Sequence, residues 1–327
     1  MVGIPLEALE DRKDKPLGEQ YEVSYAPSAT IFAWLVEQRR AHPAPDHATQ
    51  LSALLVGDPE FGEPGQPTTD EGHPEPPAIP EPSHVTLAPS RQRGDTLLTA
   101  PTTRGPSRPS LPRLPGTRVE VEGLAPLWPK ARVLLGREAS ENALLELART
   151  GAMARFGVLH FATHARVDND RPEASALELS VVDPQDAGAR RGEHPCDGVV
   201  TGREILREWK LNADLVTLSA CDTGLGREVA GEGYVGFAQA FFQAGARSLL
   251  VSLWKVEDRS TALLMRRFYE LWTGRDAGTR AKKAGMSKAA ALREAKIWLR
   301  NYSDSTGTRL YVHPYYWAGF VLLGDRD

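Results

Sequence analysis

Two residues of this chain have side chains that could form a nucleophile and its base. His164 comes just after the apolar run 158–162, and Cys221 comes just after the run 215–219. Small residues flank both positions, so main-chain N–H groups there could approach a substrate closely. A thiol becomes an effective nucleophile when a neighbouring imidazole takes its proton or stabilises the thiolate. The chemistry available to this pair is therefore nucleophilic catalysis.

The spacing of His164 and Cys221 is consistent with delivery by two neighbouring strands. They are 57 residues apart, and one helix is predicted between their strands. Sites in parallel sheets form just past the carboxyl ends of the strands, so adjacent strands would bring the two side chains together. A cysteine at a strand end is nevertheless more often a small buried residue, and a histidine there is more often structural. On the residues alone, a catalytic dyad and a pair of structural residues both remain open.

Strands and helices alternate along the chain in the order that a parallel sheet requires. Apolar runs predict strands at 22–25, 51–56, 132–135, 158–162, 215–219, 248–253 and 319–323. Amphipathic segments, several preceded by a capping residue, predict helices at 30–40, 140–149, 201–209, 235–244, 259–272 and 287–300. Because most of the strands are nearly continuous apolar runs, the pattern predicts an α/β fold with a mainly parallel central sheet and helices on both faces.

Other motifs could bind a ligand, but each fits its position poorly. His160 and His164 have the spacing of a metal pair on a helix, but on a strand they would lie about 13 Å apart. Residues 231–236 match the dinucleotide fingerprint by their glycines, but no strand directly precedes them and Glu232 would repel a pyrophosphate. Cys196 lies in a polar loop with no strand leading into it. No Walker loop, nucleophile-elbow serine, metal site or cofactor is expected.

Proline is concentrated in one part of the chain. Of the 25 prolines, 14 fall within residues 57–116, a window that contains a single aromatic residue, Phe61. A segment with so little to bury cannot offset the entropy of ordering a chain, so residues from about 60–113 are predicted to form a disordered insert. The 327 residues are therefore predicted to form one domain, 1–327, interrupted by this insert.

The overall composition argues against several classes of protein. With 39 basic and 43 acidic side chains, the chain has no positive field that would collect nucleic acid. No apolar run reaches the 18 residues of a membrane span, and the N-terminus lacks the pattern of a secretion signal. Two cysteines do not make a disulfide framework, so a reducing, cytoplasmic setting without membrane contact is expected.

Long blocks of the sequence resemble the CHAT domain, the bacterial branch of the caspase–separase clan of cysteine peptidases. The resemblance is carried by VLHFATHA (158–165), DGVVTGREI (197–205), LNADLVTLSACDTGLG (211–226), AGEGYVGFAQAFFQAGARSLLVSLWKVED (230–258) and HPYYWAGFVLLG (313–324), with IPLEAL (4–9), YEVSYAPSA (21–29) and LLVGDP (54–59) near the start. It covers nearly everything except the proline-rich insert. Family members usually have a further strand before the first block, so the chain is expected to be a trimmed piece of a longer protein or a divergent edge.

The resemblance implies a caspase-like α/β sandwich with His164 as the catalytic histidine and Cys221 as the nucleophile. It further implies that the thiolate attacks a peptide carbonyl and that the histidine gives a proton to the leaving amine. The main-chain N–H groups of Ala165 and Cys221 are expected to hold the oxyanion. Caspase relatives usually have glycine where Ala165 stands, a mild departure because the N–H group remains.

The resemblance also indicates where a substrate would bind. The expected substrate-binding residues are Ser219, Asp222, Ser252, Leu253 and Trp254. The peptide would lie extended beside residues 252–254 and pair with them main chain to main chain. Some relatives that cleave after arginine or lysine have an acid where Ser219 stands, so one reason to expect basic specificity is missing. The remaining candidate pocket acids are Asp222, Asp168 and Asp197.

The resulting hypothesis is a bacterial, cytoplasmic cysteine endopeptidase that cleaves a specific protein, such as a gasdermin-like protein or another effector of antiphage defence. A regulatory or activating partner, or an upstream region of helical repeats, is expected as well. The insert is a candidate place for a maturing cut. The alternative is a catalytically silent caspase-like module that signals by binding.

Overall fold

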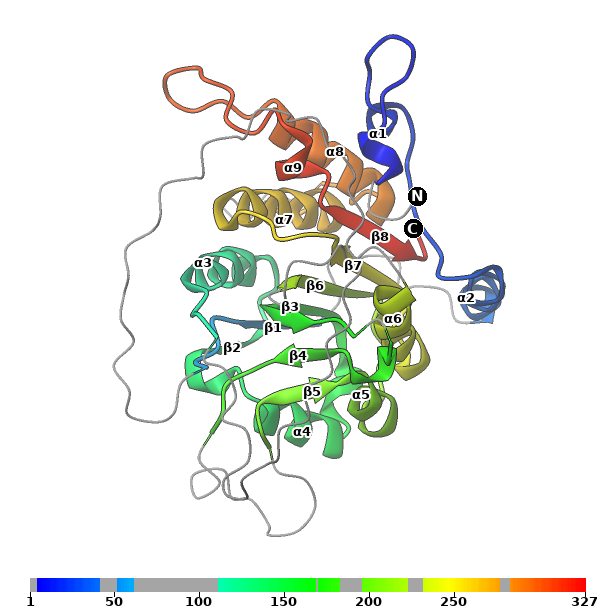
Figure 1. Ribbon diagram of the computed structural model, residues 1–327, viewed down its shortest axis with the longest axis vertical. Helices are drawn as coiled ribbons and strands as arrows, with labels where there is room; N and C mark the ends of the chain where they lie inside the picture. Colours follow the sequence, from blue (N-terminus) through cyan, green and yellow to red (C-terminus); the bar gives the residue numbers. More distant parts are fainter. Residues whose placement is uncertain are drawn as a thin grey trace, which may run out of the picture.

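The computed structural model describes residues 5–41, 52–61, 111–168, 170–182, 196–222, 232–276 and 283–327. Its strands are β1 (Ser52–Gly57), β2 (Arg132–Leu135), β3 (Phe156–Arg166), β4 (Ala176–Glu178), β5 (Val199–Thr201), β6 (Leu215–Asp222), β7 (Ser248–Ser252) and β8 (Phe320–Gly324). Six of them form the path β2-β1-β3-β6-β7-β8 through one sheet (Figure 1). The first five strands of that path are mutually parallel, and β8 runs antiparallel to β7. The predicted, mainly parallel sheet is confirmed.

Helices cover both faces of this sheet. The helices of the described ranges are α1 (Leu17–Gln20), α2 (Ala29–Ala41), α3 (Pro115–Leu124), α4 (Glu141–Arg149), α5 (Gly202–Glu208), α6 (Glu232–Ala244), α7 (Asp258–Thr273), α8 (Lys288–Arg300) and α9 (Pro314–Trp317). In Figure 1, α3, α7 and α8 lie on one face of the sheet, and α4, α5 and α6 lie on the other. The predicted α/β class, with its three layers, is therefore confirmed.

The alternation of side chains along the strands supplies both hydrophobic cores. In β3, Val158 and Ala162 enter the core beneath α3, α7 and α8. Leu159 and Phe161 of the same strand point to the opposite core, beneath α4, α5 and α6. Successive residues of a strand face opposite sides of a sheet, so a strand buried on both faces is apolar at most of its positions.

Local capping signals place the helices that the sequence predicts. Thr201 and Glu204 form the expected capping box at α5, with Thr201 Oγ1 accepting a hydrogen bond from the Glu204 N–H at 3.2 Å. The hydroxyl of Ser140 accepts from the Ala143 N–H at the start of α4, at 3.3 Å. Each cap satisfies an N–H group that has no partner within its helix.

Five elements escape prediction because they are short or have weak local signals. Helices α1 and α9 have four residues each. β4 and β5 have three residues each, too few for a hydrophobic period to be seen. They form an antiparallel pair that joins the sheet along β3. Helix α3 has the sequence PGTRVEVEGL, with two glycines and several β-branched residues, which are poor helix formers. Its position is decided by packing against β1 and α7.

The strand predicted at 22–25 is wrong, because only its last residue pairs with the sheet. The N–H of Tyr25 donates to the carbonyl of Leu322, and its carbonyl accepts from the N–H of Gly324, both at 2.8 Å. The preceding residues have no ladder partner among the described residues. The segment therefore crosses the end of β8 instead of extending the sheet.

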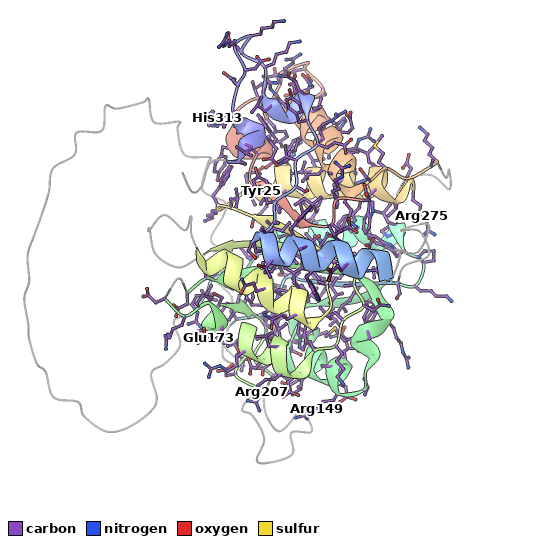
Figure 2. The ribbon with its side chains drawn as sticks, turned by 90° about the vertical axis from the view of Figure 1, so that its right-hand side faces the viewer. Tyr25, Arg149, Glu173, Arg207, Arg275 and His313 are labelled. Carbon is purple, nitrogen blue, oxygen red and sulfur yellow. The ribbon has the colours of Figure 1, made fainter. Side chains whose placement is uncertain are left out.

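Helix α2 is confirmed, but its expected apolar face is only partly buried. Leu35 packs into the core, whereas Trp34 is 38% exposed. The helix lies beside α6 at the side of the molecule (Figure 2). Between them is a cavity of about 240 Å³ that also touches residues before β6 and β7, at the amino ends of these strands. Among the described helices, α2 included, none is long and apolar enough to cross a membrane.

Candidate active site

The parallel pairing of β3 with β6 places His164 beside Cys221. The Cα of His164 pairs with that of Cys221, and the next pair is Ala165 with Asp222. Both pairs lie at the carboxyl ends of their strands, where sites form in parallel sheets. The prediction that the two residues follow their strands is wrong, because β3 continues to Arg166 and β6 to Asp222. Only the main chain of Cys221 and Asp222 is described, so the strand register defines their place.

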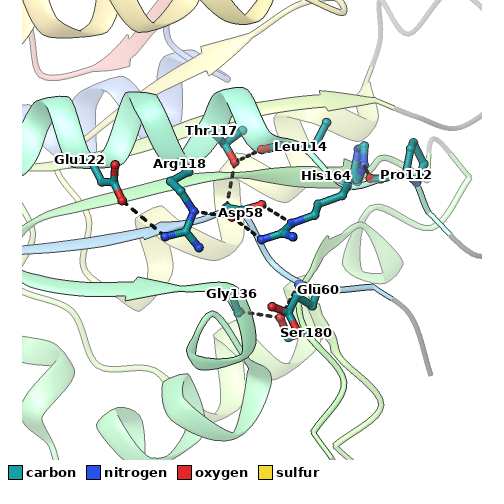
Figure 3. Close-up of polar contacts among 11 residues, drawn as sticks. Asp58, Glu60, Pro112, Leu114, Thr117, Arg118, Glu122, Gly136, His164 and Ser180 are labelled. Carbon is teal, nitrogen blue, oxygen red and sulfur yellow. Dashed lines mark hydrogen bonds and ion pairs between the residues drawn. The ribbon is translucent and has the colours of Figure 1, made fainter. Parts of the chain in front are cut away.

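A main-chain carbonyl orients the imidazole of His164. Its Nε2 lies 2.8 Å from the carbonyl oxygen of Pro112 (Figure 3). A carbonyl can only accept, so Nε2 carries the proton and donates it. In the neutral ring Nδ1 is then an acceptor, and it is buried without a hydrogen-bond partner among the described residues. The ring is thus oriented at one nitrogen and available for chemistry at the other.

The surroundings of His164 favour its neutral form. Burial is the main cause that lowers the pKa of His164, because the side chain is only 2% exposed. The hydrogen bond to Pro112 raises that pKa, and the nearby Lys255 cation lowers it further, with burial prevailing. A neutral imidazole near pH 7 can accept a proton from a thiol.

Residues from both ends of the predicted insert contact His164. The ring of Phe61 lies 5.0 Å from the imidazole, centroid to centroid, and Pro112 supplies the hydrogen bond. Residues 62–110 lie outside the described ranges. Residues 111–113, which proline content assigns to the insert, are part of the site.

A buried carboxylate ties the segment 111–113 to the sheet. Asp58 directly follows β1, is 1% exposed and accepts two hydrogen bonds from Arg113, at 2.8 and 2.9 Å. Its Oδ2 also accepts from Arg118 Nε, at 2.7 Å (Figure 3). The Asp58 N–H donates to Thr117 Oγ1, at 2.8 Å. Asp58 therefore joins β1, the start of α3 and the residue after Pro112.

A buried polar network lies farther toward the amino ends of β3 and β6. Glu120 of α3 places Oε1 3.0 Å from His160 Nε2, and its Oε2 accepts from Ser219 Oγ at 3.2 Å. The Tyr269 hydroxyl lies 2.7 Å from Thr217 Oγ1 and 3.3 Å from His160 Nδ1. Both ring nitrogens of His160 therefore lie close to polar side chains of the protein. Among the described residues, no cluster of three or more His, Cys, Asp or Glu side chains is arranged to hold a metal ion.

The strand pairing directs the N–H of Ala165 toward β6. On either side of β4, the Leu179 N–H donates to the Gly198 carbonyl and the Gly202 N–H donates to the Ser175 carbonyl. By this alternation the odd-numbered positions in and beside β4 direct their main-chain groups to the β5 side. Even-numbered residues of β4 then bond to their partners on β3, which are His164 and Arg166. The main-chain groups of Ala165 consequently face the strand that carries Cys221.

The expected substrate-binding residues lie on β6, at the end of β7 and just after it, all beyond the last paired position of the two strands. The last paired position of β6 and β7 is Leu218 with Val251, and β6 continues beyond it to Asp222. Ser252 ends β7 and is buried, and the Leu253 N–H donates to Gly319 at 2.7 Å. Trp254 is half-buried and donates from Nε1 to the carbonyl of Tyr315, at 3.1 Å.

The pairing of β7 with β8 decides which main-chain groups at the end of β7 face β6. The Leu253 N–H is used on the β8 side, so the groups of Ser252 lie on the side of β6. Ser219 is on β6, two residues before Cys221, with its hydroxyl bonded to Glu120. The residues predicted to bind substrate therefore surround the ends of β6 and β7.

Three site residues could not be found from the sequence. Pro112 acts through its carbonyl, a group that every residue possesses. Asp58 and Arg113 are 55 positions apart, with no shared motif.

The other cysteine, Cys196, is half-buried. Burial is the main cause that raises the pKa of its thiol, and the nearby Glu141 raises it further. That environment suits an unreactive cysteine.

Comparisons with known proteins show what this chain is similar to. A family model for the CHAT domain matches residues 1–325. A segment of 127 residues is 29% identical to tetratricopeptide repeat protein 28 of Mus musculus, covering 39% of this chain and 4% of that protein. The Homo sapiens protein of the same name is 28% identical over 127 residues, with the same coverage. Separase of Saccharomyces cerevisiae, in a complex with securin, aligns over 94% of this chain and 14% of its own, with 10% identity and a TM-score of 0.46.

The fold and the site define an α/β protein that brings a histidine and a cysteine together at the carboxyl ends of adjacent parallel strands. The chain belongs to the CHAT domain family. The matched segment spans about 4% of the length of these curated relatives.

Proposed function

We propose that this chain is a cysteine endopeptidase with Cys221 as nucleophile and His164 as its acid–base partner. The observation that carries the proposal is the pairing of these two positions on β3 and β6. The hydrogen bond from His164 Nε2 to Pro112 supports it, because it leaves Nδ1 as the proton acceptor of the ring. Membership of the CHAT family supports the same chemistry.

The reaction divides into two proton-balanced halves. His164 Nδ1 accepts the thiol proton as the sulfur of Cys221 attacks the peptide carbonyl carbon and forms a tetrahedral oxyanion. Collapse breaks the C–N bond, Nδ1 gives its proton to the leaving amine, and a thioester remains. Water then gives a proton to Nδ1 as its oxygen attacks the thioester. When the C–S bond breaks, the sulfur leaves and the proton returns to it.

The main chain around the pair would stabilise this chemistry and hold the peptide. The N–H groups of Ala165 and Cys221 are proposed to bind the oxyanion, consistent with the direction of Ala165 toward β6. The substrate is proposed to lie extended beyond the last pair of β6 and β7, beside Ser252, Leu253 and Trp254. Ser219 and Asp222 would border the pocket for the residue at the cleaved bond.

The proposal extends from the chemistry to the biological setting of the enzyme. We propose a cytoplasmic enzyme of bacterial antiphage defence, with a gasdermin-like protein or another effector as substrate. This step rests on family analogy, since the fold itself does not define a substrate. The curated relatives are named for tetratricopeptide repeats, which supports a role for a repeat region or another activating partner.

Peptide-library cleavage tests the dyad directly. Wild type, Cys221→Ala and Cys196→Ala would be compared at equal concentration, with Cys196→Ala as the matched control. We expect Cys221→Ala to lower kcat by about 10⁴-fold or more, because the nucleophile is lost, and Cys196→Ala to retain wild-type rates. Cleavage by Cys221→Ala at the wild-type rate would contradict the proposal.

Labelling with a thiol-directed peptide electrophile separates the enzyme from a silent binding module. An active dyad should direct the label to Cys221 far faster than to Cys196, whose environment raises its thiol pKa. Equal labelling of the two cysteines would favour the module.

A further inference from the structure

The Pro112 carbonyl that orients His164 has no secondary structure of its own to hold it. Residues 111–114 belong to no helix or strand, and proline has no N–H with which to join a ladder. The hydrogen bond to Nε2 nevertheless requires the oxygen to stay within about 0.3 Å of its place. Some other contact must therefore fix this short segment relative to β3.

The contact next to Pro112 is a two-pronged ion pair. Arg113 donates from Nε to Asp58 Oδ1 at 2.8 Å and from Nη2 to Asp58 Oδ2 at 2.9 Å. A planar guanidinium bonded to both oxygens of a carboxylate fixes orientation as well as distance. The residue that follows the orienting carbonyl is thus clamped, although 38% of its own side chain is exposed.

Asp58 is itself fixed to the strand beside the histidine. It follows Gly57, the last residue of β1, which pairs with Ala162 of β3. Its carbonyl accepts from the Gly136 N–H at 3.1 Å, and its N–H donates to Thr117. The clamp and His164 are therefore both attached to the β1–β3 strand pair.

We propose that Asp58 and Arg113 are positioning residues for His164, acting through the Pro112 carbonyl. The clamp holds that carbonyl in place, the carbonyl selects the tautomer with the proton on Nε2, and Nδ1 is left to serve Cys221. The catalytic consequence rests on the proposed function, whereas the orientation of the ring is a separate, measurable property.

Arg118 provides a matched control because it binds the same carboxylate from a different element. Its Nε donates to Asp58 Oδ2 at 2.7 Å, but it lies on α3 and also contacts Glu122. The two arginines have nearly equal exposure, 38% and 39%. Arg113→Gln and Arg118→Gln each remove one cation from Asp58, so they should cost similar stability, yet only the first loosens Pro112.

The test measures the tautomer of His164 and the reactivity of Cys221 in the full chain. Imidazole ¹⁵N shifts should report the proton on Nε2 in wild type and Arg118→Gln, and a mixture of tautomers in Arg113→Gln. Alkylation of Cys221 by iodoacetamide at pH 7.5 should slow by about 10- to 100-fold in Arg113→Gln, a typical result of displacing a catalytic group. Arg113→Lys should recover only part of the rate, because an ammonium cannot bond both oxygens in the same plane.

The two readouts distinguish failure of this proposal from failure of the proposed function. If Arg113→Gln keeps the wild-type ¹⁵N pattern, or Arg118→Gln changes it equally, the clamp is structural only and the positioning role is wrong. If Arg113→Gln changes the pattern as expected while wild-type Cys221 reacts no faster than Cys196, positioning stands and the dyad fails. Denaturation curves for both variants would establish that the comparison is made between folded proteins.

Discussion

His164 derives its protonation state from its surroundings, which sequence position alone does not define. Two histidines on the same strand, His160 and His164, are both buried. His160 lies against Glu120 and Tyr269, whereas His164 has a carbonyl on one nitrogen and no partner on the other among the described residues. One is therefore part of a structural network, and the other is suited to proton transfer.

The positive charge of Lys255 lowers the pKa of His164. Lys255→Gln removes a cation that lowers the pKa of His164, so the imidazolium becomes easier to form. The acid limb of kcat/KM against pH should therefore move to higher pH at low salt. The change should shrink at 1 M salt, where the Debye length is about 3 Å. A downward shift at low salt would contradict the assignment.

Glu141 is a buried carboxyl whose ionisation should change the stability of the fold. Burial raises the pKa of this carboxyl from 4.5 to about 7, with the Gly198 N–H opposing the change. Because the folded state binds more protons than the unfolded state between these values, stability should fall as pH rises from 4.5 to 7. Glu141→Gln keeps an acceptor for Gly198 and removes the charge, so it should be roughly 1–3 kcal/mol more stable than wild type at pH 8.

Urea denaturation at pH 5 and pH 8 measures this difference. The variant should lose much of the pH dependence that wild type shows between these values. Glu138→Gln, at an exposed position, should behave like wild type at both. Parallel pH profiles for wild type and Glu141→Gln would contradict the role of Glu141.

At the scale of elements, ion pairs attach helices to particular strands. Lys288 begins α8, is fully buried and donates to Asp214 Oδ1 at 3.0 Å, just before β6. The pair therefore ties α8 to the strand that carries Cys221. Buried pairs of this kind contribute little net energy when intact, but removing one partner leaves an uncompensated charge.

Lys288→Met should accordingly destabilise the chain by about 3–5 kcal/mol, because Asp214 stays buried without its cation. The free energy of unfolding in urea measures the loss. Lys288→Met combined with Asp214→Asn should lose less than the single variant, since the unpaired charge is gone. A single variant as stable as wild type would mean that Asp214 finds another partner or water.

Some helices and strands are specified by nearby residues, and others by residues far away in the sequence. Helices α4, α5 and α8 each have a hydroxyl cap and an apolar period, and all were predictable. The carboxyl ends of β3 and β6 were not, because His164 and Cys221 interrupt the apolar run. Pairing with neighbouring strands provides their main-chain partners instead.

At the scale of the whole molecule, the first described residues are joined to helix α8 near the end of the chain. Glu7 Oε1 accepts a hydrogen bond from Lys296 Nζ at 3.0 Å, and its Oε2 accepts one from the Tyr25 hydroxyl at 2.5 Å. The side chains of Glu7 and Lys296 are almost fully buried. Burial lowers the pKa of Lys296 and raises that of Tyr25. The network makes residues 5–25 part of the folded unit.

Glu7→Gln should reduce the free energy of unfolding by about 3–5 kcal/mol, because Lys296 loses its counter-charge in a buried site. Because the network joins both ends of the described chain, unfolding should remain a single transition with a lower midpoint. The exposed Glu10 offers a control, and Glu10→Gln should leave the midpoint unchanged. Equal midpoints for the two variants would show that the N-terminal segment contributes nothing.

The sequence by itself determined the class of fold, the long helices and most strands, and it singled out His164 and Cys221 as candidate residues. These features depend on hydrophobic period, on caps and on residue types, all of which are local and written in the chain. Only the tertiary structure decided that β3 and β6 pair at those two residues, that Pro112 orients the ring and that Asp58 clamps Arg113. The physical reason is that a main-chain carbonyl is the same in every residue, so its role depends on which distant group the fold places beside it.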